Sequence, residues 1–143
     1  MNVAAILKSK GRAVATARPE TTLQAAAEKM SAKRIGSLVV LGASGTVVGI
    51  ISERDIIRAI AERGRDCLEQ PVSEFMTRQV VVCSEADTLD QLMATMTAGR
   101  MRHIPVLEDD ALVGIVSIGD VVKHHIAEVE MEASALRTYL LAG

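Results

Sequence analysis

Residues 48–58 have the sequence V-G-I-I-S-E-R-D-I-I-R, and residues 113–123 repeat it as V-G-I-V-S-I-G-D-V-V-K. Five of these 11 aligned positions are identical, and four more exchange residues of the same kind. Each stretch predicts a β-branched strand that passes directly into a helix. The chain is therefore an internal duplication, and this strand-to-helix junction occurs once in each copy.

The duplication extends well beyond these two stretches. Met30 matches Met96 and Arg34 matches Arg100, both at an offset of 66 residues. After the next predicted strand the offset falls to 65, because G-A-S-G in the first copy faces E-D-D in the second. A period of this length, repeated twice, predicts two similar halves rather than a solenoid.

Length and composition limit the classes of protein to which the chain can belong. The chain has 143 residues, 49% of them hydrophobic, and its only aromatic residues are Phe75 and Tyr139. We expect a first repeat at residues 1–66 and a second at 67–143. Because a half of this size is marginal alone, we also expect the halves to share one core. The formal net charge of -2 and the small number of aromatic side chains make nucleic acid a poor candidate for a partner.

Hydrophobic periodicity predicts an α+β fold with the order β-α-β-β-α in each half. A short helix is expected at residues 2–8. The first half should then contain a β-rich stretch at 13–16, a helix capped by Thr21 or Thr22, strands at 37–41 and 47–51, and a helix at 53–62. The second half should contain a strand at 80–83, a helix at 89–98, strands at 103–107 and 112–116, and a helix from residue 118.

The tail, residues 124–141, extends the last helix with apolar residues at helical spacing. Two interpretations stay open for it. The tail is either an arm for a partner subunit or a helix that lies across its own module.

Location and metal binding follow from what the chain contains. Apolar runs are too short to span a bilayer, and the first residues lack the pattern of a signal peptide. Cys67 and Cys83 have no metal-ligand spacing, so we expect reduced thiols in a cytoplasmic protein without a metal site. The chain also offers no paired nucleophile and base and no Gly-rich phosphate loop, so we expect no enzyme.

Two interpretations apply to the motif S-x-x-D at Ser52–Asp55 and Ser117–Asp120. In one, it is only a helix cap, in which each side chain satisfies a free backbone N–H. In the other, the helix N-terminus attracts a phosphate and the acid accepts hydrogen bonds from ribose hydroxyls. Both copies place the motif directly after a strand, which favours a nucleotide site.

With Gly, two apolar residues, Ser, two variable residues and Asp at 49–55 and again at 114–120, the chain resembles the tandem CBS-domain pair, or Bateman module. The resemblance covers essentially the whole chain. It implies two CBS repeats packed face to face about a pseudo-twofold axis, with a C-terminal helix. It also implies two clefts, each shared between the halves, in which an adenine lies between apolar side chains and backbone groups.

The resemblance assigns residues to both clefts. The first is expected to contain Ser52, Arg54, Asp55, Val80, Met101, Arg102 and His103. The second is expected to contain Ser117, Asp120, Ala13, Ile35, Gly36 and Ser37. The first set holds two arginines and a histidine, whereas the second is poorer in cations unless Arg102, Lys10 or Arg12 turns toward it. We therefore expect unequal affinities in the two clefts.

These observations predict a regulatory module that binds an adenine nucleotide as ligand, with no catalytic cofactor. AMP is the first candidate, and ADP, ATP and NAD(H) are the others. By resemblance we expect a homodimer that acts on an unknown effector protein, with no nucleic acid and no membrane as partner. Two alternatives stay open: a ligand-independent dimeric scaffold, and an ACT-like amino-acid sensor, which would need a further strand after each final helix.

Overall fold

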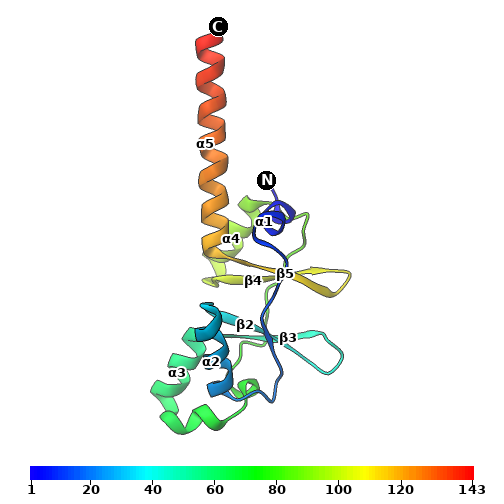
Figure 1. Ribbon diagram of the computed structural model, residues 1–143, viewed down its shortest axis with the longest axis vertical. Coiled ribbons are helices and arrows are strands. Elements are labelled where there is room, and N and C mark those ends of the chain that lie inside the picture. The colour runs from blue at the N-terminus through cyan, green and yellow to red at the C-terminus, as the bar shows by residue number, and fades with distance from the viewer.

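The computed structural model describes residues 1–143 and contains two small sheets that lie one above the other (Figure 1). The first sheet has the order β1 (Thr16–Ala17), β2 (Ser37–Leu41), β3 (Val47–Ser52). The second pairs β4 (His103–Glu108) with β5 (Ala111–Ser117). Within each sheet the last two strands form an antiparallel hairpin, as the repeat predicts.

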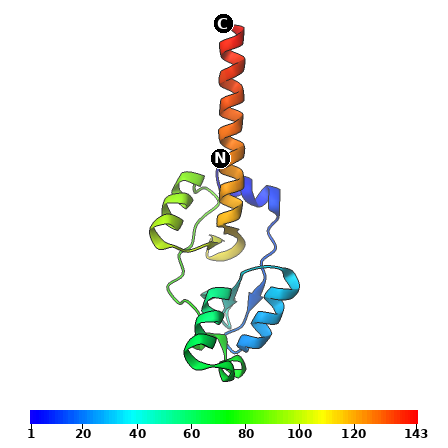
Figure 2. The same cartoon turned by 90° about the vertical axis from the view of Figure 1, so that its left-hand side faces the viewer.

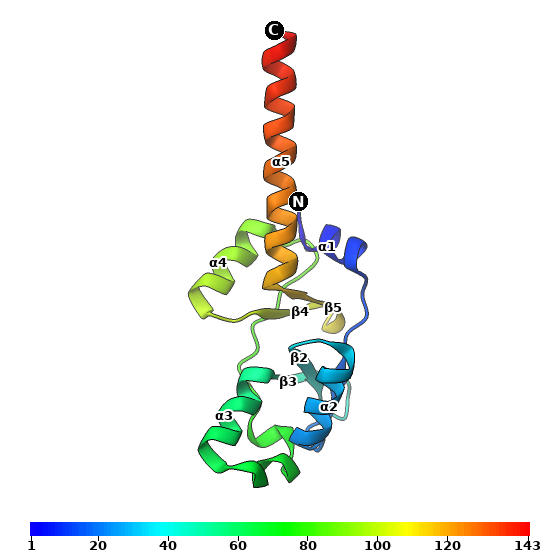
Figure 3. The same cartoon turned by 60° about the vertical axis from the view of Figure 1, so that its left-hand side comes forward.

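Helices cover the outer side of each sheet (Figure 3). Helices α2 (Leu23–Lys33) and α3 (Glu53–Arg63) lie outside the first sheet, followed by 3-10 turns η1 (Arg65–Glu69) and η2 (Val72–Glu74). Outside the second sheet lie α1 (Val3–Lys10), α4 (Leu89–Gly99) and α5 (Ile118–Ala142). Neither repeat has a further strand after its final helix, which argues against the ACT-like alternative. The α+β fold, the paired repeats and the C-terminal helix are confirmed.

Residues 80–83 do not form the expected strand, so this prediction is wrong. Only Cys83 pairs with β4, through a parallel bridge to Val106. Extending this ladder by one step requires the N–H of residue 105 to reach the carbonyl of Val81, and Pro105 has no N–H. In the first half Val39 stands in the place of Pro105, and its N–H does bind the carbonyl of Ala15 at 3.2 Å. Strand β1 itself is shorter and later than expected, at Thr16–Ala17 instead of 13–16.

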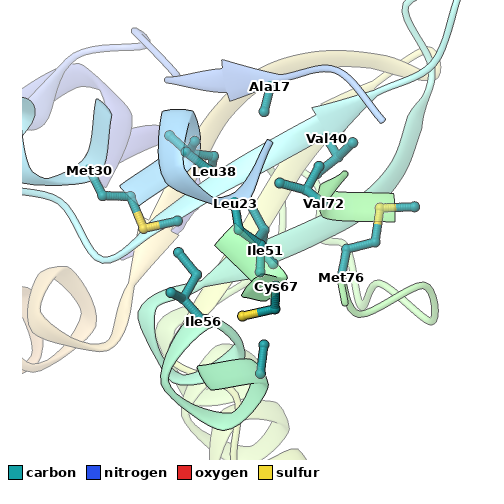
Figure 4. Close-up of a cluster of buried hydrophobic side chains, with 12 residues drawn as sticks. Ala17, Leu23, Met30, Leu38, Val40, Ile51, Ile56, Cys67, Val72 and Met76 are labelled. Carbon is teal, nitrogen blue, oxygen red and sulfur yellow. The ribbon is translucent and has the colours of Figure 1, made fainter. Parts of the chain in front are cut away.

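The expectation of one shared core is also wrong, because the buried apolar residues other than Val39 form two separate clusters. The first cluster joins strands β2 and β3 to α2, α3 and the two 3-10 turns (Figure 4). In it Leu38, Val40 and Ile51 are fully buried. Each half thus has its own core, and the division of the chain at residue 66 stays a prediction.

The second cluster is completed by the N-terminal helix, from the opposite end of the chain. Val3, Ile6 and Leu7 of α1 are at most 1% exposed and pack with residues of α4, β4, β5 and α5. A Cβ atom at Gly114 would lie 2.6 Å from the Cδ2 atom of Leu7, so only glycine lets α1 approach β5 this closely. Gly49 plays the same part in β3, where a Cβ would lie 2.5 Å from the sulfur of Met76.

Helix α5 begins in the second repeat and then leaves the body of the protein (Figure 2). Its first turn is held by Val121, which is 1% exposed, whereas every residue from 129 to 143 is exposed. The tail therefore does not lie across its own module. No helix of the protein has the length and apolar character needed to cross a membrane.

Candidate functional site

The junction of β3 and α3 is a complete capping box. The hydroxyl of Ser52 accepts a hydrogen bond from the N–H of Asp55 at 3.2 Å, and Oδ2 of Asp55 accepts one from the N–H of Ser52 at 2.9 Å. Ser117 and Asp120 repeat this arrangement at the start of α5 with distances of 3.2 and 2.9 Å. The capping interpretation is therefore confirmed in both copies, but it occupies only one oxygen of each carboxylate.

A cavity of about 370 Å³ lies between the two halves beside the first junction. All seven residues that the sequence assigns to the first cleft line it, together with nine others. The lining residues are Gly36, Ile50, Ser52, Glu53, Arg54, Asp55, Arg58, Thr77, Gln79, Val80, Val81, Gly99, Arg100, Met101, Arg102 and His103. The volume is within the range of about 300–1,000 Å³ that small-molecule sites occupy.

Positive charge exceeds negative charge around this cavity. Four arginines line it against two acids, Glu53 and Asp55. Arg54, Arg100 and Arg102 are exposed and form no ion pair within the protein, while Arg58 lies 3.7 Å from Oδ1 of Asp55. Unpaired guanidinium groups bind phosphate oxygens through charge-assisted, often bidentate hydrogen bonds. The cavity therefore suits an anionic ligand.

The acid in the cavity keeps one free oxygen. Asp55 is only 7% exposed, and its Oδ2 accepts hydrogen bonds from the N–H and the hydroxyl of Ser52 at 2.9 and 3.0 Å. Its Oδ1 has only the long contact to Arg58. Because Oδ1 accepts no hydrogen bond within the protein, it is available as an acceptor for a ligand hydroxyl.

The apolar wall of the cavity comes from the segment that fails to form a strand. Residues 79–82 make no backbone hydrogen bonds, although the segment is anchored before them by Thr77, whose N–H binds the carbonyl of Ile50 at 2.8 Å. Val80 and Val81 thus present both apolar side chains and free backbone groups to the cavity, opposite Met101. Free backbone donors and acceptors beside apolar side chains can recognise a planar base.

His103 lies between the two junctions. Burial lowers the pKa of His103, and Lys10 nearby lowers it further, against weaker opposing effects of Glu53 and Asp120. The neutral imidazole is therefore favoured at neutral pH. In this form His103 can donate or accept a hydrogen bond, but it adds no charge to the cavity.

The second junction differs because Lys10 occupies it. The Nζ atom of Lys10 lies 2.6 Å from Oδ2 of Asp120 and donates to the carbonyl of Ile115 at 3.0 Å. Burial raises the pKa of Asp120, but hydrogen bonds from Lys10 and Ser117 outweigh it, so the pKa lies below its ordinary value. Neither Ser117 nor Asp120 lines the cavity beside the first junction.

The other residues assigned to the second cleft come from the first half of the chain. Gly36 lines the first cavity, and with Ile35 it also lines a separate groove between α2 and α3. Ser37, the next residue, is 5% exposed at the start of β2, and Ala13 lies in the link between α1 and β1. The residues of the first set thus line one cavity, whereas the second cleft stays a prediction.

Sequence reasoning missed several residues of the first cavity. Arg100 caps the end of α4 in the left-handed conformation with φ 56°, as Arg34 does after α2 with φ 55°. This repetition was visible in the sequence, but its position beside the cavity was not. Gln79 was missed as well. Met76 and Leu7 pack on equivalent glycines of the two repeats, and Gln79 follows Met76 at the same spacing as Lys10 follows Leu7. Gln79 in the first cavity is therefore the counterpart of Lys10 at the second junction.

The chain is similar to known proteins over most of its length. The CBS domain family matches residues 10–62 and 72–126 of the chain. The CBS domain-containing protein CBSX3, mitochondrial, of Arabidopsis thaliana is 35% identical over 147 residues, which cover 96% of this chain and 71% of that protein.

Two solved structures are similar throughout. The CBS-domain containing protein ATU1752 from Agrobacterium tumefaciens has 48% identity and a TM-score of 0.83, covering 85% of this chain and 91% of that one. The CBS domain pair of protein MJ0100, in complex with 5'-methylthioadenosine and S-adenosyl-L-methionine, has 26% identity and a TM-score of 0.79, covering 90% and 98% of the two chains. From the doubled family match, the relatives and the fold, the chain belongs to the CBS domain family and carries two CBS domains in tandem.

Proposed function

We propose that the first cleft binds an adenine nucleotide, with AMP as the first candidate, and that the protein is a regulatory module rather than an enzyme. The observation that carries this proposal is a cavity in which three features meet: a carboxylate oxygen of Asp55 that accepts no hydrogen bond, three arginines without an ion pair, and an apolar segment without backbone hydrogen bonds. Asp55 would hold the ribose hydroxyls. Arg54, Arg100 and Arg102 would hold the phosphate, and Val80 and Met101 would enclose the base.

The charge of the cavity favours a phosphorylated ligand over the ligands of the MJ0100 pair. S-Adenosyl-L-methionine carries a sulfonium cation, and 5'-methylthioadenosine has no phosphate. Four arginines against two acids repel a cation and leave the arginines without a counterion. ADP, ATP and NAD(H) share the phosphate and stay as alternatives to AMP.

The proposed signal follows from where the ligand lies. The cavity takes its walls from both halves, and the halves have separate cores, so a bound nucleotide would bridge two bodies that are otherwise able to shift. Binding would then shift the equilibrium toward one angle between the halves, by the difference in the ligand's binding free energy between the two arrangements. An effector protein would respond to this change.

Calorimetry with the Asp55→Asn variant tests the proposal. Loss of a hydrogen bond to a charged group costs about 1.5–3 kcal/mol, so AMP affinity should fall about 10- to 100-fold. Asp120→Asn is the matched control, because it disturbs the equivalent capping box and leaves the first cleft intact. Equal affinities for AMP in wild type and Asp55→Asn would contradict the proposal.

A second titration separates the phosphate from the nucleoside. Arg102→Ala should weaken AMP and leave adenosine unchanged, because Arg102 would contact only the phosphate. The wild-type protein should also show unequal clefts, since Lys10 already occupies the carboxylate of Asp120. Two identical sites would contradict this difference.

The scaffold alternative rests on the capping boxes, which are complete without a ligand. A scaffold would show no affinity for AMP, ADP, ATP or NAD(H) in thermal-shift screening, where a bound ligand raises the melting temperature.

Under either function we propose that two copies of the chain associate. A cytoplasmic location also stays a prediction, and both cysteines are free thiols.

A further inference from the structure

We infer that α5 is one strand of a parallel, in-register two-stranded coiled coil formed with a second copy of this chain. This inference deepens the proposed self-association by placing it on a particular helix, and it does not depend on nucleotide binding. The observations that carry it are the spacing of apolar residues on α5, the side of the helix on which they lie, and the charges that flank them.

The apolar residues of α5 follow a heptad pattern without a break. Steps of four, three, four, three and four residues connect Val122, Ile126, Val129, Ala133, Leu136 and Leu140. Alternating steps of four and three describe the a and d positions of a coiled coil, with a at 126, 133 and 140 and d at 122, 129 and 136. We call these six residues the α5 seam.

The α5 seam is uncovered in the single chain. Its five large side chains are between 48% and 67% exposed. The half of α5 beyond residue 129 contacts nothing else, and an isolated helix of about 12–15 residues is marginal in water. A helix that extends about 37 Å, at 1.5 Å per residue over its 25 residues, therefore requires a partner to bury this surface.

The seam also faces away from the chain's own module. The contacts of α5 with its module include Val121, which is buried, and Glu128, whose Oε1 lies 3.4 Å from the N-terminal amine. Both residues occupy heptad position c, which lies on a different side of the helix from a and d. A second helix can thus approach the α5 seam without displacing α1.

Charges beside the seam indicate a second copy in parallel orientation. In a parallel pair, Glu132 at position g meets Arg137 at position e of the partner helix. An antiparallel pair with the same layers in contact would set Glu130 against Glu130 and Glu132 against Glu132. It would also set Lys123 against Arg137. The flanking charges are therefore complementary only in the parallel arrangement.

Disulfide trapping of the full chain tests the orientation. Ala133→Cys places a thiol at the centre of the seam, where two copies meet at the same residue only in the parallel register. We expect rapid covalent dimer formation under mild oxidation. Ala135→Cys, at position c, is the matched control and should not cross-link. The native cysteines are buried and add no background. A dimer that Ala133→Cys fails to trap would overturn the parallel coiled coil.

Sedimentation of charge and seam variants tests the interface itself. Leu136→Glu should raise the dimer dissociation constant at least about a hundredfold, and circular dichroism should show the folded body unchanged, because Leu136 is exposed in the single chain. Glu132→Arg should weaken the dimer about tenfold, and Glu132→Arg combined with Arg137→Glu should restore it. A dimer insensitive to Leu136→Glu, or a helix that binds lipid vesicles while the protein stays monomeric, would overturn the inference. Neither result would alter the nucleotide titrations, so the two proposals fail separately.

Discussion

Replacing Lys10 by Met should destabilise the protein by about 1–2 kcal/mol. The Nζ atom of Lys10 is 2.6 Å from Asp120 and 3.0 Å from the carbonyl of Ile115, and the two charged side chains are 31% and 22% exposed. A fully exposed ion pair contributes about 0.2–1 kcal/mol, and a hydrogen bond to a charged group about 1.5–3 kcal/mol. Because the pair is partly exposed, we expect its contribution to lie between these two free energies. Met keeps most of the apolar stem of Lys10, so the substitution removes mainly the charge.

Urea unfolding measures the loss. With a slope of about 2 kcal/mol per molar urea, the midpoint should fall by about 0.5–1 M. Lys8→Met is the matched control, because Lys8 lies on the same helix, is exposed and forms no ion pair. The control should leave the free energy of unfolding within about 0.5 kcal/mol of wild type.

The pH dependence identifies the cause of the loss. The pKa of Asp120 is lower in the folded protein than its ordinary value of about 3.9, so the ionised carboxylate stabilises the fold above about pH 4. This stabilisation is lost as the pH falls through the folded-state pKa. The difference between wild type and Lys10→Met should therefore be full at pH 7 and shrink under acid. A difference that stays constant with pH would refute the ion pair as its source.

Two further predictions concern packing. Gly114→Ala should destabilise the protein by about 1–3 kcal/mol, because the new Cβ would lie 2.6 Å from Leu7. The control Gly119→Ala, whose Cβ would have its nearest neighbour 3.7 Å away, should leave the thermal unfolding midpoint unchanged or raise it. Equal midpoints for the two variants would show that α1 can shift to make room without a loss of stability. Burial, with a smaller effect of Asp87, raises the pKa of the Cys83 thiol to about 12, so the native protein should resist a thiol reagent at pH 8 that modifies the unfolded chain; fast native labelling at Cys83 would contradict this burial.

Much of the fold was predictable because it depends on short-range patterns, whereas the residues of the first cleft were predicted from the family resemblance. The hairpins and the caps at Thr22, Ser52 and Ser117 follow from periodicity and local hydrogen bonding within three residues. The strand at 80–83 was mispredicted although the cause, Pro105, stands in the sequence. Its effect appears only when residue 81 is known to lie beside residue 105.

By itself the sequence determined the duplication, the order of elements within each repeat and the pairing of Ser with Asp at each junction, because each of these rests on neighbours along the chain. Only the tertiary structure decided that α1 completes the core of the second half, that α5 leaves the body, and that Lys10 is the residue that distinguishes the two junctions. The contact that separates them joins Lys10 to Asp120 across 110 residues. Nothing local to either residue encodes such a contact, since it arises from the packing of α1 against β5.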